Sequence, residues 1–123
     1  MAKVTVVNKK IRFVKHSDIV KFQILTHCYV NGMTLSNNEL DCLTLLTMTG
    51  KQELSEFCNI VVDEKIFKTS QTVRNFLTKG VTLGLVVKEG TIKKTIEPNS
   101  ELQIQINGNL LLNYTFAYVT KEQ

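Results

Sequence analysis

The stretch Ser70 to Lys88, SQTVRNFLTKGVTLGLVVK, decides the fold of this chain. A serine opens the stretch, and Val73 and Leu77 follow at helical spacing, which predicts a helix over residues 70–80. After Gly84 the chain changes to β-branched residues followed by lysines, which predicts a basic hairpin. A helix that leads directly into a basic hairpin is therefore the centre of the predicted fold.

The predicted hairpin has two short β-prone runs, residues 85–88 and 91–96, joined at Glu89-Gly90. Lysines flank its tip. Lysines in such a place contact the sugar-phosphate backbone of DNA, which adds affinity without reading the sequence. The lysines concerned are Lys88, Lys93 and Lys94.

The helix before the hairpin, capped by Thr69 or Ser70, would present polar side chains to solvent. Gln and Asn can bind adenine through two hydrogen bonds and Arg can bind guanine, each pair contributing roughly 1 to 3 kcal/mol of discrimination. Since any exposed helix face is polar, the adjoining hairpin is what favours DNA. The helix residues expected at a DNA interface are Ser70, Gln71, Thr72, Arg74, Asn75, Thr78 and Lys79.

Residues 70–88 resemble the winged helix-turn-helix family, MarR-like regulators in particular, whose recognition helix runs T-V-S-R-x-I-x-x-L-x-x-x-G-L-V-x-R. The matching residues are Thr72, Val73, Leu77, Gly84, Leu85, Val86 and Lys88. Arg74-Asn75 stands where the family often has Ser-Arg. Gly80 stands where it has a core leucine, so we expect the helix to be shortened or loosened, at about 1 kcal/mol relative to Ala. The resemblance implies an α+β winged helix with this helix in the major groove.

Three helices are predicted before this unit. Ser36 and Glu39 form an S-x-x-E capping box, and a leucine-rich face follows until Gly50. Its core residues are Leu40, Leu43, Leu46 and Thr47, with Leu35 and Leu40 as the hydrophobic staple. A helix capped at Ser17-Asp18 and ended by Gly32 precedes it, with a stripe of Ile19, Phe22, Leu25 and Tyr29 and, beside it, Val20, Ile24 and Cys28. A third helix follows Lys51-Gln52 and ends early, with Leu54, Phe57 and either Ile60 or Val61 inside.

The two ends of the chain are predicted to be β-rich. Residues 1–15 form either a strand or a free basic arm. Residues 97–123 form an added hairpin, in which Glu101 to Ile106 alternate as ELQIQI and Asn107-Gly108 makes a two-residue turn before LLLNYTFAYV. This last run can also pair with the N-terminal strand. The whole chain is expected to be one domain, with residues 16–96 as the winged-helix body.

Charge is arranged in blocks along the sequence. The net charge is +4, but residues 1–15 carry +5, residues 16–64 carry −5, residues 65–94 carry +6 and the remaining tail carries −2. A basic N-terminus and a basic helix-hairpin unit would make one positive face if they meet in space. We therefore predict secondary phosphate contacts at Lys9, Lys10 and Arg12.

Several functions are not expected. Three cysteines without a CxxC spacing predict buried, reduced thiols, with no disulfide and no zinc. The two histidines lack partners at metal-ligand spacing, and we find no phosphate-binding loop or activated nucleophile, so no cofactor and no catalysis are predicted. Apolar runs are shorter than the ~20 residues of a membrane span, and the N-terminus is basic, so we expect a cytoplasmic protein.

Two functions from different classes remain. The basic blocks and the polar helix face favour a DNA-binding transcriptional regulator. The small size of the chain and its bias toward Lys, Asn, Ile and Thr resemble those of small winged-helix proteins of bacteriophages with AT-rich genomes, which implies a phage-type regulator. Gly80 and the large β-rich ends favour a structural protein of a phage virion, such as a head-tail connector or ring component whose partners are other virion proteins. We expect a homo-oligomer, and its order separates the two functions: a regulator should be a monomer or a two-fold dimer, whereas a ring component should be of higher order.

Overall fold

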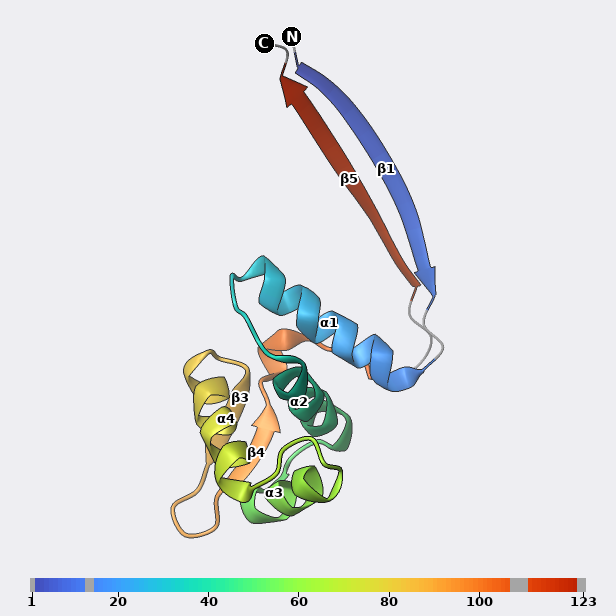
Figure 1. Cartoon of the computed structure of the whole chain (residues 1–123). Helices are drawn as coiled ribbons and strands as arrows, with labels where there is room; N and C mark the ends of the chain where they lie inside the picture. The colour runs from blue at the N-terminus through green and yellow to red at the C-terminus, as the bar shows by residue number, and fades with distance from the viewer. Residues whose placement is uncertain (1, 13–14, 107–110, 122–123) are drawn as a thin grey trace.

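The computed structural model describes residues 2–12, 15–106 and 111–121, and the side chains of residues 15–106. The four helices are α1 (His16–Val30), α2 (Asn37–Thr49), α3 (Leu54–Asp63) and α4 (Ser70–Thr82). The strands are β1 (Ala2–Arg12), β2 (Gln52–Glu53), β3 (Val86–Glu89), β4 (Thr95–Pro98) and β5 (Leu111–Lys121). Two parts are distinct in Figure 1: a helical body, residues 15–106, and a ribbon formed by β1 and β5.

The body is a winged helix, so the predicted α+β class is confirmed. Its small sheet has the order β2-β4-β3, with both pairs antiparallel. The register joins Glu89 to Thr95, which leaves residues 90–94 as the loop of the wing. The predicted two-residue turn at Glu89-Gly90 was therefore too short. The two-residue strand β2 was not predicted, since so short a segment has no periodicity.

The core lies where the inner faces of the helices meet the sheet. Its fully buried side chains come from every helix and from the wing strands, among them Ile24, Leu43, Leu46, Phe57, Leu77, Leu85 and Ile96. All three cysteines, Cys28, Cys42 and Cys58, are buried free thiols, in the core positions that the sequence predicts. The core thus fixes α4 against β3 and sets the position of the wing.

The start of α2 agrees with the prediction in detail. The Ser36 side chain accepts a hydrogen bond from the Glu39 backbone at 3.2 Å, and the Glu39 side chain accepts one from the Ser36 backbone at 2.8 Å. This reciprocal pair is the capping box, which satisfies two backbone N–H groups at the helix start. The helix ends at Gly50, whose φ of 82° is readily adopted only by glycine.

The buried face of α1 differs from the predicted stripe. Val20, Ile24 and Cys28 are buried, whereas the Leu25 side chain is 46% exposed and that of Tyr29 is 85% exposed. Both sets of residues have helical spacing. Val20, Ile24 and Cys28, which lie beside the predicted stripe, form the face of α1 that packs against α2. The start was also misplaced, because α1 begins at His16 and its N-cap, Lys15, makes no side-chain hydrogen bond.

Gly80 does not shorten or loosen α4, contrary to the prediction. The helix continues to Thr82, and Gly80 is buried against β3. A Cβ atom at this position would lie 2.9 Å from Cγ2 of Val86. The glycine therefore permits a close contact between the helix and the first wing strand. The helix ends with hydrogen bonds from Gly84 to Val81 and from Leu85 to Gly80, which close a Schellman motif.

In α3 the residue that faces the core is Val61, which is fully buried, while Ile60 is 37% exposed. The helix ends at Asp63, as early as its β-branched run predicted. Lys65 then adopts a φ of 60°, and hydrogen bonds from Lys65 to Val62 and from Ile66 to Val61 complete the helix end. The same closing pattern thus ends both α3 and α4.

The predicted C-terminal hairpin is wrong in its first strand. Residues 100–102 form a 3-10 turn, and residues 103–106 form no strand. The Gln23 side chain exchanges two hydrogen bonds, of 2.9 and 2.8 Å, with the backbone of Gln105. A side chain of α1 thus satisfies the backbone groups that a strand partner would have taken. The predicted Asn107-Gly108 turn lies outside the described residues.

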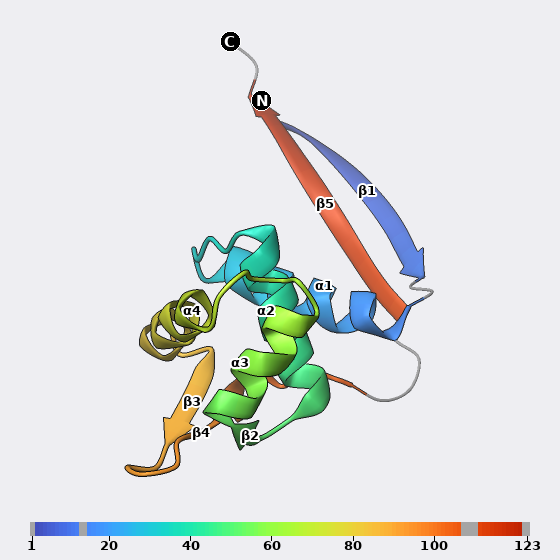
Figure 2. The same cartoon turned by 60° about the horizontal axis from the view of Figure 1, so that its bottom comes forward.

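The partner of β5 is β1, the other possibility that the sequence allowed. The two strands pair antiparallel along their whole length, from Ala2 opposite Lys121 to Arg12 opposite Leu111. Among the described elements, both strands make their extensive contacts only with each other. Figures 1 and 2 show the ribbon beyond α1, away from α4 and the wing.

Candidate nucleic-acid interface

The outward face of α4 is polar and uncharged. Thr69 caps the helix by accepting a hydrogen bond from the Thr72 backbone at 3.2 Å. Val73, Phe76, Leu77 and Gly80 face the core, and the residues opposite them in the helical repeat, all exposed, are Gln71, Asn75, Thr78 and Thr82. The Gln71 amide donates to the Asn75 side chain at 2.8 Å, which joins the two amide side chains into one unit. Ser70 and Thr72, predicted for the same interface, are also exposed.

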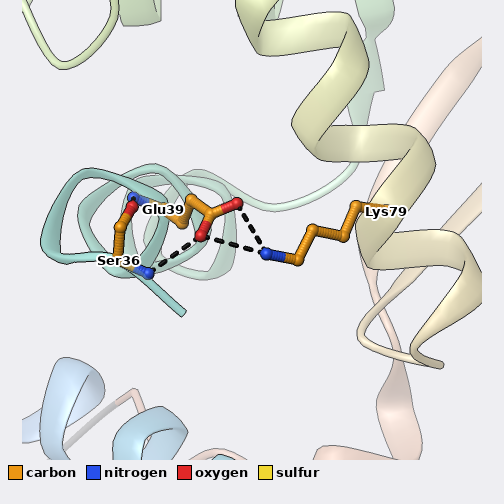
Figure 3. A network of polar contacts seen from close by, with 3 residues as sticks. All are labelled: Ser36, Glu39 and Lys79. Atoms are coloured by element: carbon orange, nitrogen blue, oxygen red, sulfur yellow. Dashed lines mark hydrogen bonds and ion pairs between the residues drawn. The ribbon is translucent and has the colours of Figure 1, made fainter. Parts of the chain in front are cut away.

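The two cations of α4 lie at its flanks and contact neighbouring helices. Arg74 is half-buried, and its Nη2 lies 3.3 Å from the hydroxyl of Ser55 at the start of α3. Lys79 lies on the opposite flank, where its Nζ is 3.0 and 3.2 Å from the two carboxylate oxygens of Glu39 (Figure 3). Neither cation belongs to the outward face, although the sequence assigned both to the interface.

The Glu39 side chain therefore has two partners: the backbone of Ser36 at the start of α2, and Lys79 on α4. Partial burial acts to raise the pKa of its carboxyl group. The hydrogen bond from the Ser36 backbone and the hydrogen bond and charge of Lys79 outweigh burial, and the pKa lies below its ordinary value of 4.5. The capping box of α2 is thus connected by charge to the flank of α4 (Figure 3).

On the other flank, Arg74 and Lys88 act on the same buried thiol. Burial raises the pKa of Cys58, and the positive charges of Arg74 and Lys88 act in the opposite direction. Burial also raises the pKa of Cys28, and it raises that of Cys42 to about 12, with Cys58 and Glu39 adding to the effect. The three thiols are therefore held in the protonated, unreactive form. Arg74 and Lys88, from α4 and β3, lie on the side of the site that adjoins α3.

Two cations of the predicted site lie in the loop of the wing and have no partner within residues 15–106. Lys93 and Lys94 are exposed, and within residues 15–106 their side chains have no ion pair or hydrogen bond. Ile92 between them and the turn is 96% exposed. The sequence did not single out Ile92, although an isoleucine beside a turn glycine and two lysines was the available signal.

Contacts at the base of the wing hold it to residues 51–54, at the start of α3. The backbone N–H of Leu54, at the start of α3, donates to the carbonyl of Lys94 at 2.9 Å. Lys51 lies 3.6 Å from Glu89 and 3.9 Å from Glu97, one on each wing strand. Gly90, with a φ of 97°, has no room for a side chain, because a Cβ would lie 2.4 Å from the Lys93 carbonyl oxygen. The loop is thus presented beside α4 in a defined conformation.

The predicted secondary contacts do not join this site. Lys9, Lys10 and Arg12 lie on β1, and both views place that strand beyond α1, on the far side from α4 and the wing (Figure 2). Their side chains lie outside the described residues. The single positive face predicted from the charge blocks is therefore divided between two separate places.

No family model matches this chain, and no curated protein matches it in sequence. Among solved structures it is similar to the ferric uptake regulator Fur of Helicobacter pylori, described as having three functional metal binding sites. The TM-score is 0.51 and the identity 10%, over 85% of this chain and 73% of that one. At this identity the likeness shows the fold alone, and it supports the winged helix.

Across the described residues, no three or more His, Cys, Asp and Glu side chains gather as a metal site would require. None of the helices within the described residues is long and apolar enough to cross a membrane.

Proposed function

We propose that the protein is a DNA-binding winged-helix protein that places α4 in the major groove and the wing on the phosphate backbone. One observation carries the proposal: α4, whose exposed face is uncharged and holds the Gln71–Asn75 pair, lies beside a wing whose loop lysines have no partner within residues 15–106 (Figure 1). In DNA recognition, amide side chains form hydrogen bonds with base edges in the groove, and cations contact the phosphate backbone.

The two parts of the interface have different tasks. Gln71 and Asn75 carry the donors and acceptors that match the edge of adenine, and their mutual hydrogen bond holds them side by side before DNA arrives. Lys93 and Lys94 neutralise phosphates, and this contribution is the same for every sequence. The helix therefore supplies specificity and the wing supplies affinity.

The finer assignment is a transcriptional regulator of the phage type, cytoplasmic, without catalytic activity and forming homo-oligomers. Its support is the composition, which is rich in Lys, Asn, Ile and Thr, and the resemblance of residues 70–88 to MarR-like recognition helices. The departure at Gly80 no longer weakens that resemblance, because the glycine makes room for β3 without interrupting α4.

A second candidate is a structural protein of a phage virion that uses the winged helix for docking to other proteins. The observation that favours it is the ribbon, whose two 11-residue strands make their extensive contacts, among the described elements, only with each other. An isolated two-stranded ribbon is marginally stable in water, so a partner that covers it would stabilise it. This candidate predicts higher-order rings and no preference for DNA sequence.

The test is fluorescence anisotropy with labelled duplexes, one selected from a random pool and one unrelated. We expect Asn75→Ala to weaken binding to the selected duplex by about 5- to 150-fold, the equivalent of 1 to 3 kcal/mol, and to leave the unrelated duplex unaffected. Lys93→Gln with Lys94→Gln should weaken both duplexes by the same factor. Lys21→Gln, a lysine paired with Asp41 on the helical body, serves as the control. Absence of salt-sensitive binding by the wild type, or failure to select any duplex, would contradict the proposal.

A further inference from the structure

The net positive charge of the chain resides in the ribbon. Five of the fifteen Lys and Arg residues lie in β1 and β5, and none of the eleven acidic residues does. The body, residues 15–106, holds the other ten cations and also ten acids, so its net charge is zero; Glu122 is the eleventh acid. The ribbon alone therefore carries +5. Its cations are Lys3, Lys9, Lys10, Arg12 and Lys121.

Within the body, the cations nearest to the predicted interface are partly occupied. Lys79 is paired with Glu39, Arg74 is bonded to Ser55, and Lys51 lies between Glu89 and Glu97. Lys93 and Lys94 have no partner within residues 15–106, but a body whose net charge is zero attracts a polyanion only weakly at long range. The larger share of the long-range attraction to nucleic acid is therefore expected from the ribbon, whereas Lys93 and Lys94 act at short range.

The register divides the ribbon into segments. Lys3 and Lys121 stand at the end far from the body, opposite Thr120 and Ala2. Lys9, Lys10 and Arg12 stand at the end near the body, and the positions between, 4–8 and 115–119, are uncharged. At about 3.3 Å per residue, an 11-residue strand spans about 36 Å, roughly one turn of duplex DNA. The ribbon thus presents cations at both ends of a groove-length element.

We propose that the β1–β5 ribbon is a second DNA-binding element, which holds the phosphate backbone of a duplex independently of α4 and the wing. A two-stranded ribbon has the width that the major groove admits. The choice of DNA rests on the proposed function, and the site itself rests on the charge of the ribbon. Because the ribbon lies beyond α1 from the wing, it contacts a different segment of duplex from the one that α4 reads.

A second copy of the ribbon is a poorer partner. Two ribbons brought together as one sheet would gather ten cations and no acid, and like charges on adjacent strands are destabilising. A duplex carries one negative charge per about 1.7 Å and releases counterions when cations bind. Charge complementarity therefore assigns the ribbon to a polyanion.

The experiment compares two full-length variants that lose the same charge. Lys9→Gln with Lys10→Gln removes two ribbon cations, and Lys21→Gln with Lys65→Gln removes two body cations that lie outside α4 and the wing. Binding to a labelled duplex of about 30 base pairs and unrelated sequence is measured between 50 and 200 mM salt. Thermal melting shows that both variants are folded.

We expect the slope of log K against log salt to become shallower by about 1.8 in the ribbon variant, about a 12-fold smaller loss of affinity over this range, and to change by less than half as much in the body variant. Lys9→Arg with Lys10→Arg, which keeps the charge, should keep the wild-type slope. Equal slopes for the ribbon variant and the wild type would overturn the ribbon proposal.

The failures of the two proposals are distinguishable. If the wild type shows no salt-sensitive binding at all, both are wrong, and the ribbon belongs to protein docking. If the Lys93→Gln, Lys94→Gln variant of the wing loses affinity and the ribbon variant does not, the proposed function stands and the ribbon proposal is wrong. If only the ribbon variant loses affinity, the ribbon binds DNA and the assignment of α4 and the wing is wrong.

Discussion

The body and the ribbon divide the properties of this chain between them. The body buries a core drawn from four helices and a three-stranded sheet, and its charges balance. The ribbon has an excess of five positive charges and, among the described elements, no extensive contact beyond its own two strands. The difference indicates that the fold is determined in the body, whereas the net positive charge is concentrated in the ribbon. Three further predictions test this separation.

The largest effect is expected from the core of the body. Phe57→Ala removes a fully buried side chain and should lower the free energy of unfolding by about 3 to 5 kcal/mol. Val6→Ala, in β1, should change the unfolding of the body by less than about 1 kcal/mol, because β1 pairs with β5 alone. Denaturation by urea, followed by circular dichroism at the helical signal, measures both. Similar losses for the two variants would show that the ribbon packs on the body.

An intermediate effect is expected where α4 meets the wing. Gly80→Ala would place a methyl group 2.9 Å from Cγ2 of Val86, which is buried and has a stiff side chain. Overpacking costs about 1 to 3 kcal/mol, and replacing glycine within a helix returns about 1 kcal/mol, so we expect a net loss of about 1 kcal/mol. The double variant with Val86→Ala should lose less than the sum of the two single variants. Additive losses would mean that the close contact is not what requires glycine.

The smallest effect concerns pH. Glu39 has a pKa below its ordinary value, so its contribution to stability is complete above pH 4.5 and is lost as the pH falls through the lowered folded value. Glu39→Gln should therefore lower the free energy of unfolding by about 0.2 to 1 kcal/mol at neutral pH and by less near pH 3. Urea denaturation at the two pH values measures the difference. A loss of equal size at both would show that charge is not involved. Acids are absent from β1 and β5, so this titration belongs to the body alone.

Local signals in the sequence predicted the body well. The capping box at Ser36 and Glu39 involves groups three residues apart, so the sequence contains the whole interaction. The helix-hairpin order of residues 70–96 likewise depends on neighbours and led to the correct fold class. The outward residues Gln71 and Asn75 follow from helical periodicity once the core face is known.

Choices that depend on distant residues were not predictable in the same way. Two apolar stripes run along α1, and which one is buried depends on where α2 packs. Gly80 looked like a defect because its partner, Val86, lies on another element. The contacts of Arg74 and Lys79, with Ser55 and Glu39, join residues 19 and 40 positions apart, so the sequence did not show that both cations lie at the flanks of α4.

The pairing of β1 with β5 has a consequence for the order in which the molecule forms. Each strand lies at one end of the sequence, and the register joins Ala2 to Lys121. A chain is synthesised from its N-terminus, so β1 emerges before the body and β5 emerges after it. The helices and the wing can assemble from nearby contacts while β1 has no partner, whereas pairing between such distant segments is slow. The ribbon is therefore the last element to form. Until β5 pairs with it, β1 is an unpaired strand, and its lysines oppose pairing with strands of other chains.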